Sequence, residues 1–117
     1  MSYVDGFVVA VPKQHLEAYK KLARTAGEVW KEHGALAYVE CSSDDVPYGE
    51  LTSFPRAVLA QDDEIVIFAW IVYESRERRD AVLAKVMADP RMKHDPADMP
   101  FDGKRMIFGG FESFVEM

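Results

Sequence analysis

Charged side chains inside apolar, strand-like segments are the residues of this sequence most able to do chemistry. Asp5, Glu40, Arg56, Arg105 and Glu112 all fall within segments that otherwise read as buried. Because an unpaired buried charge is costly, each of them must pair with an opposite charge, reach solvent or line a cavity. Two interpretations stay open. The charges form a structural network of acids and arginines, or they line a pocket that holds a ligand carboxylate or moves a proton.

Aromatic side chains would supply the apolar part of such a pocket. Trp70 lies in the middle of an apolar strand segment, and Trp30 lies on the apolar side of a predicted helix. Either ring could stack on a flat ligand, and packing in the core is the alternative role for both. The resulting hypothesis is a ligand-binding site formed by Asp5, Glu40, Arg56, Trp70 and Arg105.

The histidines and the cysteine predict neither a metal site nor a reactive thiol. His15, His33 and His94 are far apart, and no pair has the spacing of metal ligands. Cys41 follows Glu40, and a neighbouring carboxylate disfavours the thiolate, so we interpret it as a small apolar residue in a buried strand. No phosphate-binding glycine loop, nucleophile elbow or Cys-x-x-Cys motif is present, and we predict no cofactor.

The bulk composition predicts one acidic globular domain in the cytoplasm. A length of 117 residues fits a single domain spanning residues 1–117. The net charge of -6 argues against nucleic acid as a partner, because such binding depends on clustered Lys and Arg. The longest apolar run, residues 65–73, is far shorter than the ~20 residues of a membrane helix. No signal peptide is recognised, and a single cysteine is typical of a reducing compartment.

Hydrophobic periodicity predicts an α+β order of elements. Apolar residues three and four apart predict a helix over 13–33, which Gly34 would end in a left-handed conformation. A second helix follows the N-cap Ser75 and reaches residue 88, with Ala81, Val82, Val86 and Met87 facing inward. Asp89-Pro90 starts a short third helix. Strands are predicted over residues 3–11, 35–41, 64–73 and 104–115, with a possible edge strand over 54–60.

This order is the split βαβ arrangement of a ferredoxin-like domain, an antiparallel sheet with helices on one face. Gly109-Gly110 within the last strand suggests a bulge or a close backbone contact. Two helices can cover only one face of such a sheet, yet its strands carry apolar residues on both faces. Because a second copy is the simplest cover for the open face, we predict a homodimer with sheet packed on sheet.

Several stretches resemble the YbaA family of small bacterial proteins. They are residues 3–12, 39–41, 89–93, 99–107 and 109–112, and the Met99–Ile107 stretch is the most specific of them. The resemblance spans nearly the whole chain and implies a dimeric α+β barrel. It implies no reaction, since the family is classed as a domain of unknown function. The barrel superfamily holds enzymes and stress-responsive proteins alike, so fold alone transfers no activity.

Two functions from different classes remain. The first is a small cytoplasmic homodimer with a ligand-binding or stress-related role. The second is a cofactor-independent monooxygenase or isomerase that acts on a flat apolar substrate. Clustering of the charged strand residues in an accessible cavity beside Trp70 or a phenylalanine would favour the enzyme, whereas their pairing in a filled core would favour the first function.

Overall fold

The computed structural model describes residues 1–117 and contains one four-stranded antiparallel sheet. The strand order is β2-β3-β1-β4, so the two longest strands lie at the centre and the shorter ones form the edges. This confirms the predicted ferredoxin-like α+β fold. The strands are β1 (Tyr3–Pro12), β2 (Ala37–Ser42), β3 (Glu64–Tyr73) and β4 (Ile107–Glu112).

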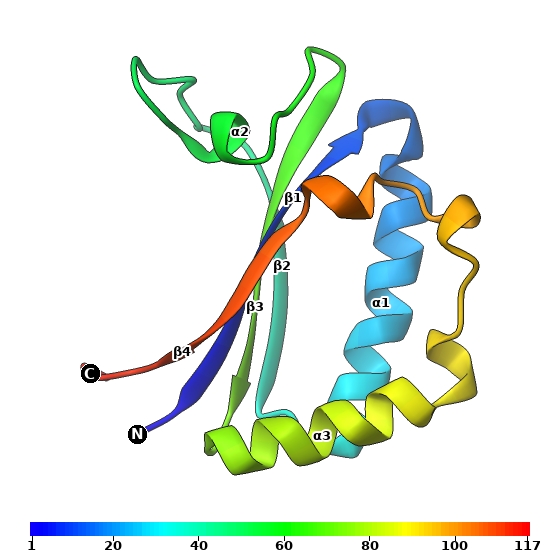
Figure 1. The fold of residues 1–117 in the computed structure, drawn as a ribbon, viewed down its shortest axis with the longest axis vertical. Coiled ribbons are helices and arrows are strands. Elements are labelled where there is room, and N and C mark those ends of the chain that lie inside the picture. The colour runs from blue at the N-terminus through cyan, green and yellow to red at the C-terminus, as the bar shows by residue number, and fades with distance from the viewer.

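The two long helices cover one face of the sheet (Figure 1). They are α1 (Leu16–His33), preceded by a 3-10 turn over Lys13–His15, and α3 (Arg76–Ala88). Gly34 ends α1 with φ of 118°, and the Ser75 side chain accepts a hydrogen bond from Arg78 N at the start of α3. Both caps agree with the sequence. None of the helices is both long enough and apolar enough to cross a membrane.

The core lies between this sheet face and the two helices. Alternate residues of β1 and β3 meet the apolar stripe of α1, and Val29, Tyr73 and Val86 are fully buried there. The prediction for α3 was wrong at two positions, because Ala81 and Met87 point to solvent, with Met87 59% exposed. Val82 and Val86, four residues apart, form the narrow buried line of this helix.

Residues 54–60 do not form the predicted edge strand. They contain a one-turn helix, α2 (Phe54–Ala57). The Ser53 side chain caps this turn by accepting from Arg56 N, and Pro55 suits the first turn because it has no N–H to offer a sheet ladder. Capping and proline chemistry therefore decide the structure of this segment, whose only β-branched residue is Val58.

The last strand is shorter than predicted and carries no bulge. Residues 103–105 form a 3-10 turn, because the Asp102 side chain accepts from Lys104 N, and pairing with β1 begins only at Ile107. The register then runs without a break to Glu112 opposite Tyr3. The predicted close contact is present, since a Cβ on Gly110 would lie 2.7 Å from Tyr3 Cε2.

The opposite face of the sheet is covered only in part. The α2 segment lies on this side (Figure 1) and buries a small cluster of Val8, Ala10, Val58 and Val66. Beyond that cluster the face is apolar and open. Phe68, Ile107 and Phe111 alternate onto it and are 42%, 45% and 65% exposed.

Candidate functional site

A cavity of about 390 Å³ lies between the sheet and α1. Its third wall is the segment after α3, which runs back along α1 to β4 (yellow to orange in Figure 1). Of its 20 lining residues 17 are hydrophobic, which matches the mainly apolar character of small-molecule sites. The side chains that matter below come from α1 (Tyr19, Ala23, Ala26, Trp30), β2 (Tyr38, Glu40), β3 (Ile67, Ala69, Ile71) and the returning segment (Met92, His94, Met99, Phe101, Met106).

Small side chains on both sides of the layer create this space. Ala23 and Ala26 lie on the face of α1 that meets the sheet, and Ala69 lies opposite them at the centre of β3. Larger neighbours, Tyr19 and Trp30, stand at either end of the alanine pair on α1. Because an alanine reaches only to Cβ, the two layers cannot meet between these larger side chains, and a void remains.

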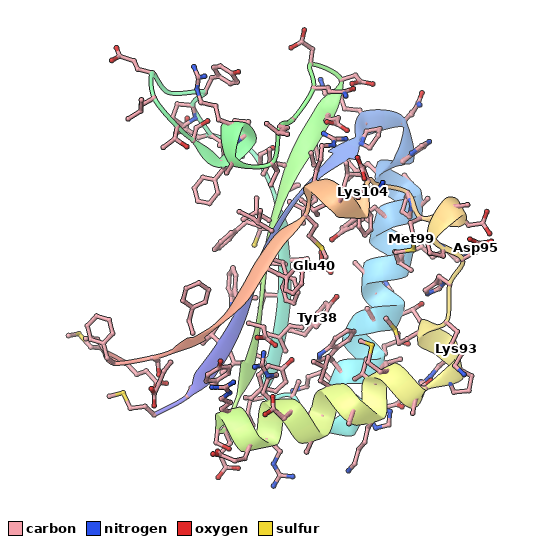
Figure 2. The ribbon with its side chains drawn as sticks, viewed as in Figure 1. Tyr38, Glu40, Lys93, Asp95, Met99 and Lys104 are labelled. Atoms are coloured by element: carbon pink, nitrogen blue, oxygen red, sulfur yellow. The ribbon has the colours of Figure 1, made fainter.

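The polar centre of the cavity is Glu40, which two tyrosines hold from different elements. Tyr38 on the same strand donates its hydroxyl hydrogen to Glu40 Oε2 at 2.6 Å, and Tyr19 of α1 donates to Oε1. Figure 2 shows Tyr38 and Glu40 together between the sheet and α1. Burial raises the pKa of both tyrosines, and the hydrogen bonds to Glu40 raise it further. Both phenols therefore stay protonated donors at neutral pH.

Aromatic rings extend from this centre along the cavity. Phe101 meets the Tyr19 ring edge-on at 5.7 Å between centroids, and Trp30 lies 5.9 Å from Tyr38 in a tilted arrangement. The indole N–H of Trp30 donates to the hydroxyl of Tyr73 at 2.9 Å, which fixes the orientation of the indole. The rings offer faces and edges to a ligand without any unsatisfied polar atom.

Three aspartates shape the third wall. Asp89, Asp95 and Asp102 each precede a 3-10 turn, and each side chain accepts a hydrogen bond from the backbone N–H two residues later. These turns bring Met92, Met99 and Phe101 to the cavity without regular secondary structure. In Figure 2 Met99 lies close to α1, whereas Lys93 and Asp95 lie on the outside of the segment.

Ion pairs fasten the start of this segment to the end of α1. Asp89 Oδ2 lies 3.0 Å from His33 Nε2, and Arg91 forms two hydrogen bonds to Glu32 at 3.2 and 2.6 Å. The Arg91 guanidinium, together with His33, holds the pKa of Asp89 well below its usual range. The wall is therefore anchored at neutral pH by a charged cluster outside the cavity.

Among the five residues predicted for a site, Glu40 alone extends its side chain into the cavity. Asp5 is buried and accepts a hydrogen bond from Arg79 Nη1 at 2.7 Å, on the helix side of the sheet near α3. Trp70 belongs to the strand that floors the cavity, but the alternation of β3 places its ring on the opposite face, 5.5 Å from the Phe68 ring.

The two arginines predicted for the site, Arg56 and Arg105, stabilise loops instead. Arg56 donates to the carbonyl oxygens of Tyr48 and Gly49, at 2.9 and 3.0 Å, and stacks over the Tyr48 ring. Arg105 forms a two-pronged pair with Glu64, both hydrogen bonds at 2.7 Å, and also bonds the carbonyl of Leu59 at 2.9 Å. The charged strand residues thus do not gather at one place.

Sequence reasoning missed the two tyrosines. Tyr38 stands two positions before Glu40, so strand alternation places both on one face, and Tyr19 lies on the apolar stripe of α1. That spacing was the available signal, although the contact between α1 and β2 depends on the tertiary fold. The prediction that Cys41 is buried was wrong, because this residue is exposed near the end of the edge strand β2. No group of three or more His, Cys, Asp or Glu residues is arranged to hold a metal ion.

Comparison with known proteins identifies the family. The sequence profile of the family described as "Protein of unknown function (DUF1428)" matches residues 2–103. The chain belongs to this family. The match includes Tyr19, Tyr38 and Glu40, and it ends before β4.

Relatives in this family extend the similarity to the full chain. "Uncharacterized protein YbaA" of Escherichia coli K12 and its counterpart in Shigella flexneri are each 55% identical over 116 residues, covering 99% of both chains. The predicted resemblance to YbaA is thereby confirmed. A solved structure described as a dimeric ferredoxin-like protein from an uncultured marine organism is 13% identical, with a TM-score of 0.51 over 100% of this chain and 98% of its own. At that identity it supports the fold alone.

Proposed function

We propose that this DUF1428 protein binds a small, mainly apolar molecule in the cavity between α1 and the sheet. The observation that carries the proposal is Glu40, a carboxylate held by two tyrosine hydroxyls inside an otherwise apolar space. Each carboxylate oxygen has further acceptor capacity, which a hydrogen-bond donor on the ligand would use. The cavity volume, about 390 Å³, lies within the range of small-molecule sites.

A neutral fluorescent probe with one N–H donor, N-phenyl-1-naphthylamine, tests this proposal. Its emission should rise on titration with the protein and saturate. Ala23→Phe should fill the cavity from α1 and weaken binding by at least about tenfold. Ala18→Phe is the matched control, because Ala18 is exposed on the same helix outside the cavity. Absence of saturable binding, or equal binding by both folded variants, would contradict the proposal.

The second candidate function is catalysis without a cofactor, as in an isomerase or a monooxygenase acting on a flat apolar substrate. It is favoured by the same side chain, because a carboxylate in an apolar cavity can accept a proton from a bound C–H or O–H acid. For any ligand that the probe titration identifies by displacement, exchange of its carbon-bound protons in D₂O separates the two functions. Exchange that depends on Glu40 indicates an enzyme, and binding without exchange indicates a binding protein.

The assembly we propose is a homodimer formed through the open sheet face. Phe68 of β3 and Ile107 of β4 lie on either side of Val8 of β1, and Phe111 lies further along β4 on the same face. All three are exposed, and such a patch favours a partner surface of the same character. The ferredoxin-like neighbour is described as dimeric, which is a statement about that protein. The compartment we propose is the cytoplasm, since Cys41 is the single cysteine and is free.

Light scattering at micromolar concentration tests the assembly. The wild-type particle should have twice the chain mass of 13.3 kDa. Phe111→Glu should give the monomer mass, because the new carboxylate would be buried without a counter-charge between the paired faces. Leu51→Glu is the control, since Leu51 is 91% exposed on the loop before α2. A wild-type particle of 13.3 kDa would refute the dimer.

A further inference from the structure

Three carboxylates of the sheet differ in what neutralises them. Asp5 pairs with Arg79 at 2.7 Å, and Glu64 pairs with Arg105 at 2.7 Å. Glu40 has no such partner: its two hydrogen bonds come from neutral hydroxyls, and no lysine, arginine or histidine forms an ion pair with it. A half-buried carboxylate is stabilised by a counter-charge, and Glu40 is the one buried or half-buried carboxylate of the sheet whose counter-charge the chain does not supply. The fourth sheet carboxylate, Glu112, is exposed to solvent at the end of β4.

The rest of the cavity lining contains one basic side chain and no permanent cation. It contains neither lysine nor arginine, and His94, exposed at the returning segment, is its one basic side chain. Lys20 and Arg24 line an adjoining hollow of about 320 Å³ between α1 and β2. The residues that border both spaces are Tyr19, Ala23, Tyr38, Glu40 and Ile67. The cavity is therefore electronegative at Glu40.

The walls beside Glu40 suit a cation as well. Tyr19 and Tyr38 flank Glu40 directly. Phe101 and Trp30 continue from them along the cavity, Phe101 edge-on to Tyr19 and Trp30 tilted against Tyr38. The face of an aromatic ring carries negative charge density, which attracts ammonium groups. Aromatic rings around a carboxylate are a common way to bind an organic cation, whereas an anion would meet repulsion from both.

We infer that the cavity takes an organic cation, an ammonium group on an aromatic or aliphatic body, with the ammonium at Glu40 and the body along the apolar wall. The inference rests on the proposed ligand-binding function and narrows its ligand class. Glu40 acts here as the counter-ion, and Tyr19 and Tyr38 orient its oxygens from α1 and β2. The acidic net charge of -6 would add attraction for cations over the whole surface, so the test must separate that effect from Glu40.

Calorimetric titration with three naphthalene probes tests the inference on the wild-type protein. They are 1-naphthylmethylamine, 1-naphthalenemethanol and 1-naphthoate, which differ in the head group. The amine is protonated at pH 7, since alkylamines have pKa values of about 10. We expect the amine to bind at least about tenfold more tightly than the alcohol, and the carboxylate to show no measurable heat. Equal affinity of amine and alcohol overturns the inference.

Variants then assign the preference to Glu40. Glu40→Gln keeps the shape and removes the charge, so the amine should lose its advantage over the alcohol. Glu17→Gln removes one charge from the same acidic surface at a side chain that is 87% exposed, and it should leave the preference unchanged. A folded Glu40→Gln protein that still prefers the amine overturns the inference. If the Glu40→Gln protein does not fold, the relative affinities of amine and alcohol for the wild-type protein still test the inference.

The outcomes also separate this inference from the proposed function. Binding of N-phenyl-1-naphthylamine and of the alcohol, both blocked by Ala23→Phe, with no preference for the amine, overturns the cation inference and leaves the cavity a binding site for neutral molecules. Absence of binding by every naphthalene probe overturns both. Tight binding of 1-naphthoate would show an anion site and would overturn the charge argument.

Discussion

The buried pair of Asp5 and Arg79 gives the sharpest prediction for stability. Asp5 is 6% exposed, and the side chain of Arg79 is 17% exposed, so the pair lies at low dielectric. Arg79→Ala would leave the Asp5 carboxylate buried without a cation. Removing one partner of a buried pair costs about 3–5 kcal/mol, and the partial exposure of Arg79 favours the lower end. We expect the free energy of unfolding to fall by about 3 kcal/mol at neutral pH.

The loss should depend on pH in a defined direction. Burial raises the pKa of Asp5 above 3.8, while the charge of Arg79 and hydrogen bonds from Tyr73 and Arg79 lower it. A carboxyl whose pKa is raised on folding binds its proton more tightly in the folded state, so its contribution to stability declines as pH rises above the unfolded value. Without Arg79 the folded pKa rises further. The difference between wild type and Arg79→Ala should therefore grow from about pH 4 to about pH 7.

Urea unfolding, followed by circular dichroism at one protein concentration, measures this difference at several pH values. Adding Asp5→Asn to Arg79→Ala should recover part of the stability at neutral pH, since no charge remains buried. Asp80→Ala is the control: Asp80 also contacts Arg79, at 2.8 Å, but its side chain is 62% exposed, so it should change stability by less than about 1 kcal/mol. A pH-independent loss below about 1 kcal/mol for Arg79→Ala would refute the reasoning.

Two further predictions concern the last strand and the turn before it. Arg105→Met should destabilise the fold at neutral pH; hydrogen bonds from Arg105 lower the pKa of Glu64 below 4.5, so the paired carboxylate stabilises the fold above that value and the effect fades as pH falls through the folded pKa. Urea unfolding at pH values from about 3 to 7 measures it, and a gap that widens in acid would contradict it. Gly110→Ala should lower the free energy of unfolding through overlap with the Tyr3 ring, by about 1 kcal/mol more than Gly109→Ala, whose Cβ would find an ordinary contact at 3.6 Å. The Gly110→Ala variant should therefore have the lower melting temperature of the two. Equal melting temperatures of the two alanine variants would show that the Tyr3 ring moves aside freely.

Local sequence patterns predicted most of the fold. The apolar stripe of α1, the capping residue Ser75 and the alternating central strands predicted the elements and their order, and the order specifies a ferredoxin-like sheet. The errors lie where short-range chemistry competes with composition. Residues 54–60 contain the strand formers Phe54 and Val58, yet a capping serine and a proline make a helical turn.

The site was predicted far less completely. Five side chains were proposed for one place, and the fold sends Asp5, Arg56 and Arg105 to three separate partners and the Trp70 ring to the other sheet face. The cavity itself has no sequence signature. The cavity exists because Ala23 and Ala26 of α1 lie opposite Ala69 of β3. The sequence pattern of one element does not indicate which side chains of the other element will face it.

The sequence by itself determined that this chain is a DUF1428-family α+β domain, because helix and strand periods, caps and family stretches are local properties. Tertiary structure decided which carboxylate lacks a counter-charge. Arg79 reaches Asp5 across 74 positions and Arg105 reaches Glu64 across 41, whereas Glu40 meets only tyrosines, one of them 21 positions away on α1. Charge pairing depends on distances in space, which sequence spacing does not encode beyond a few residues.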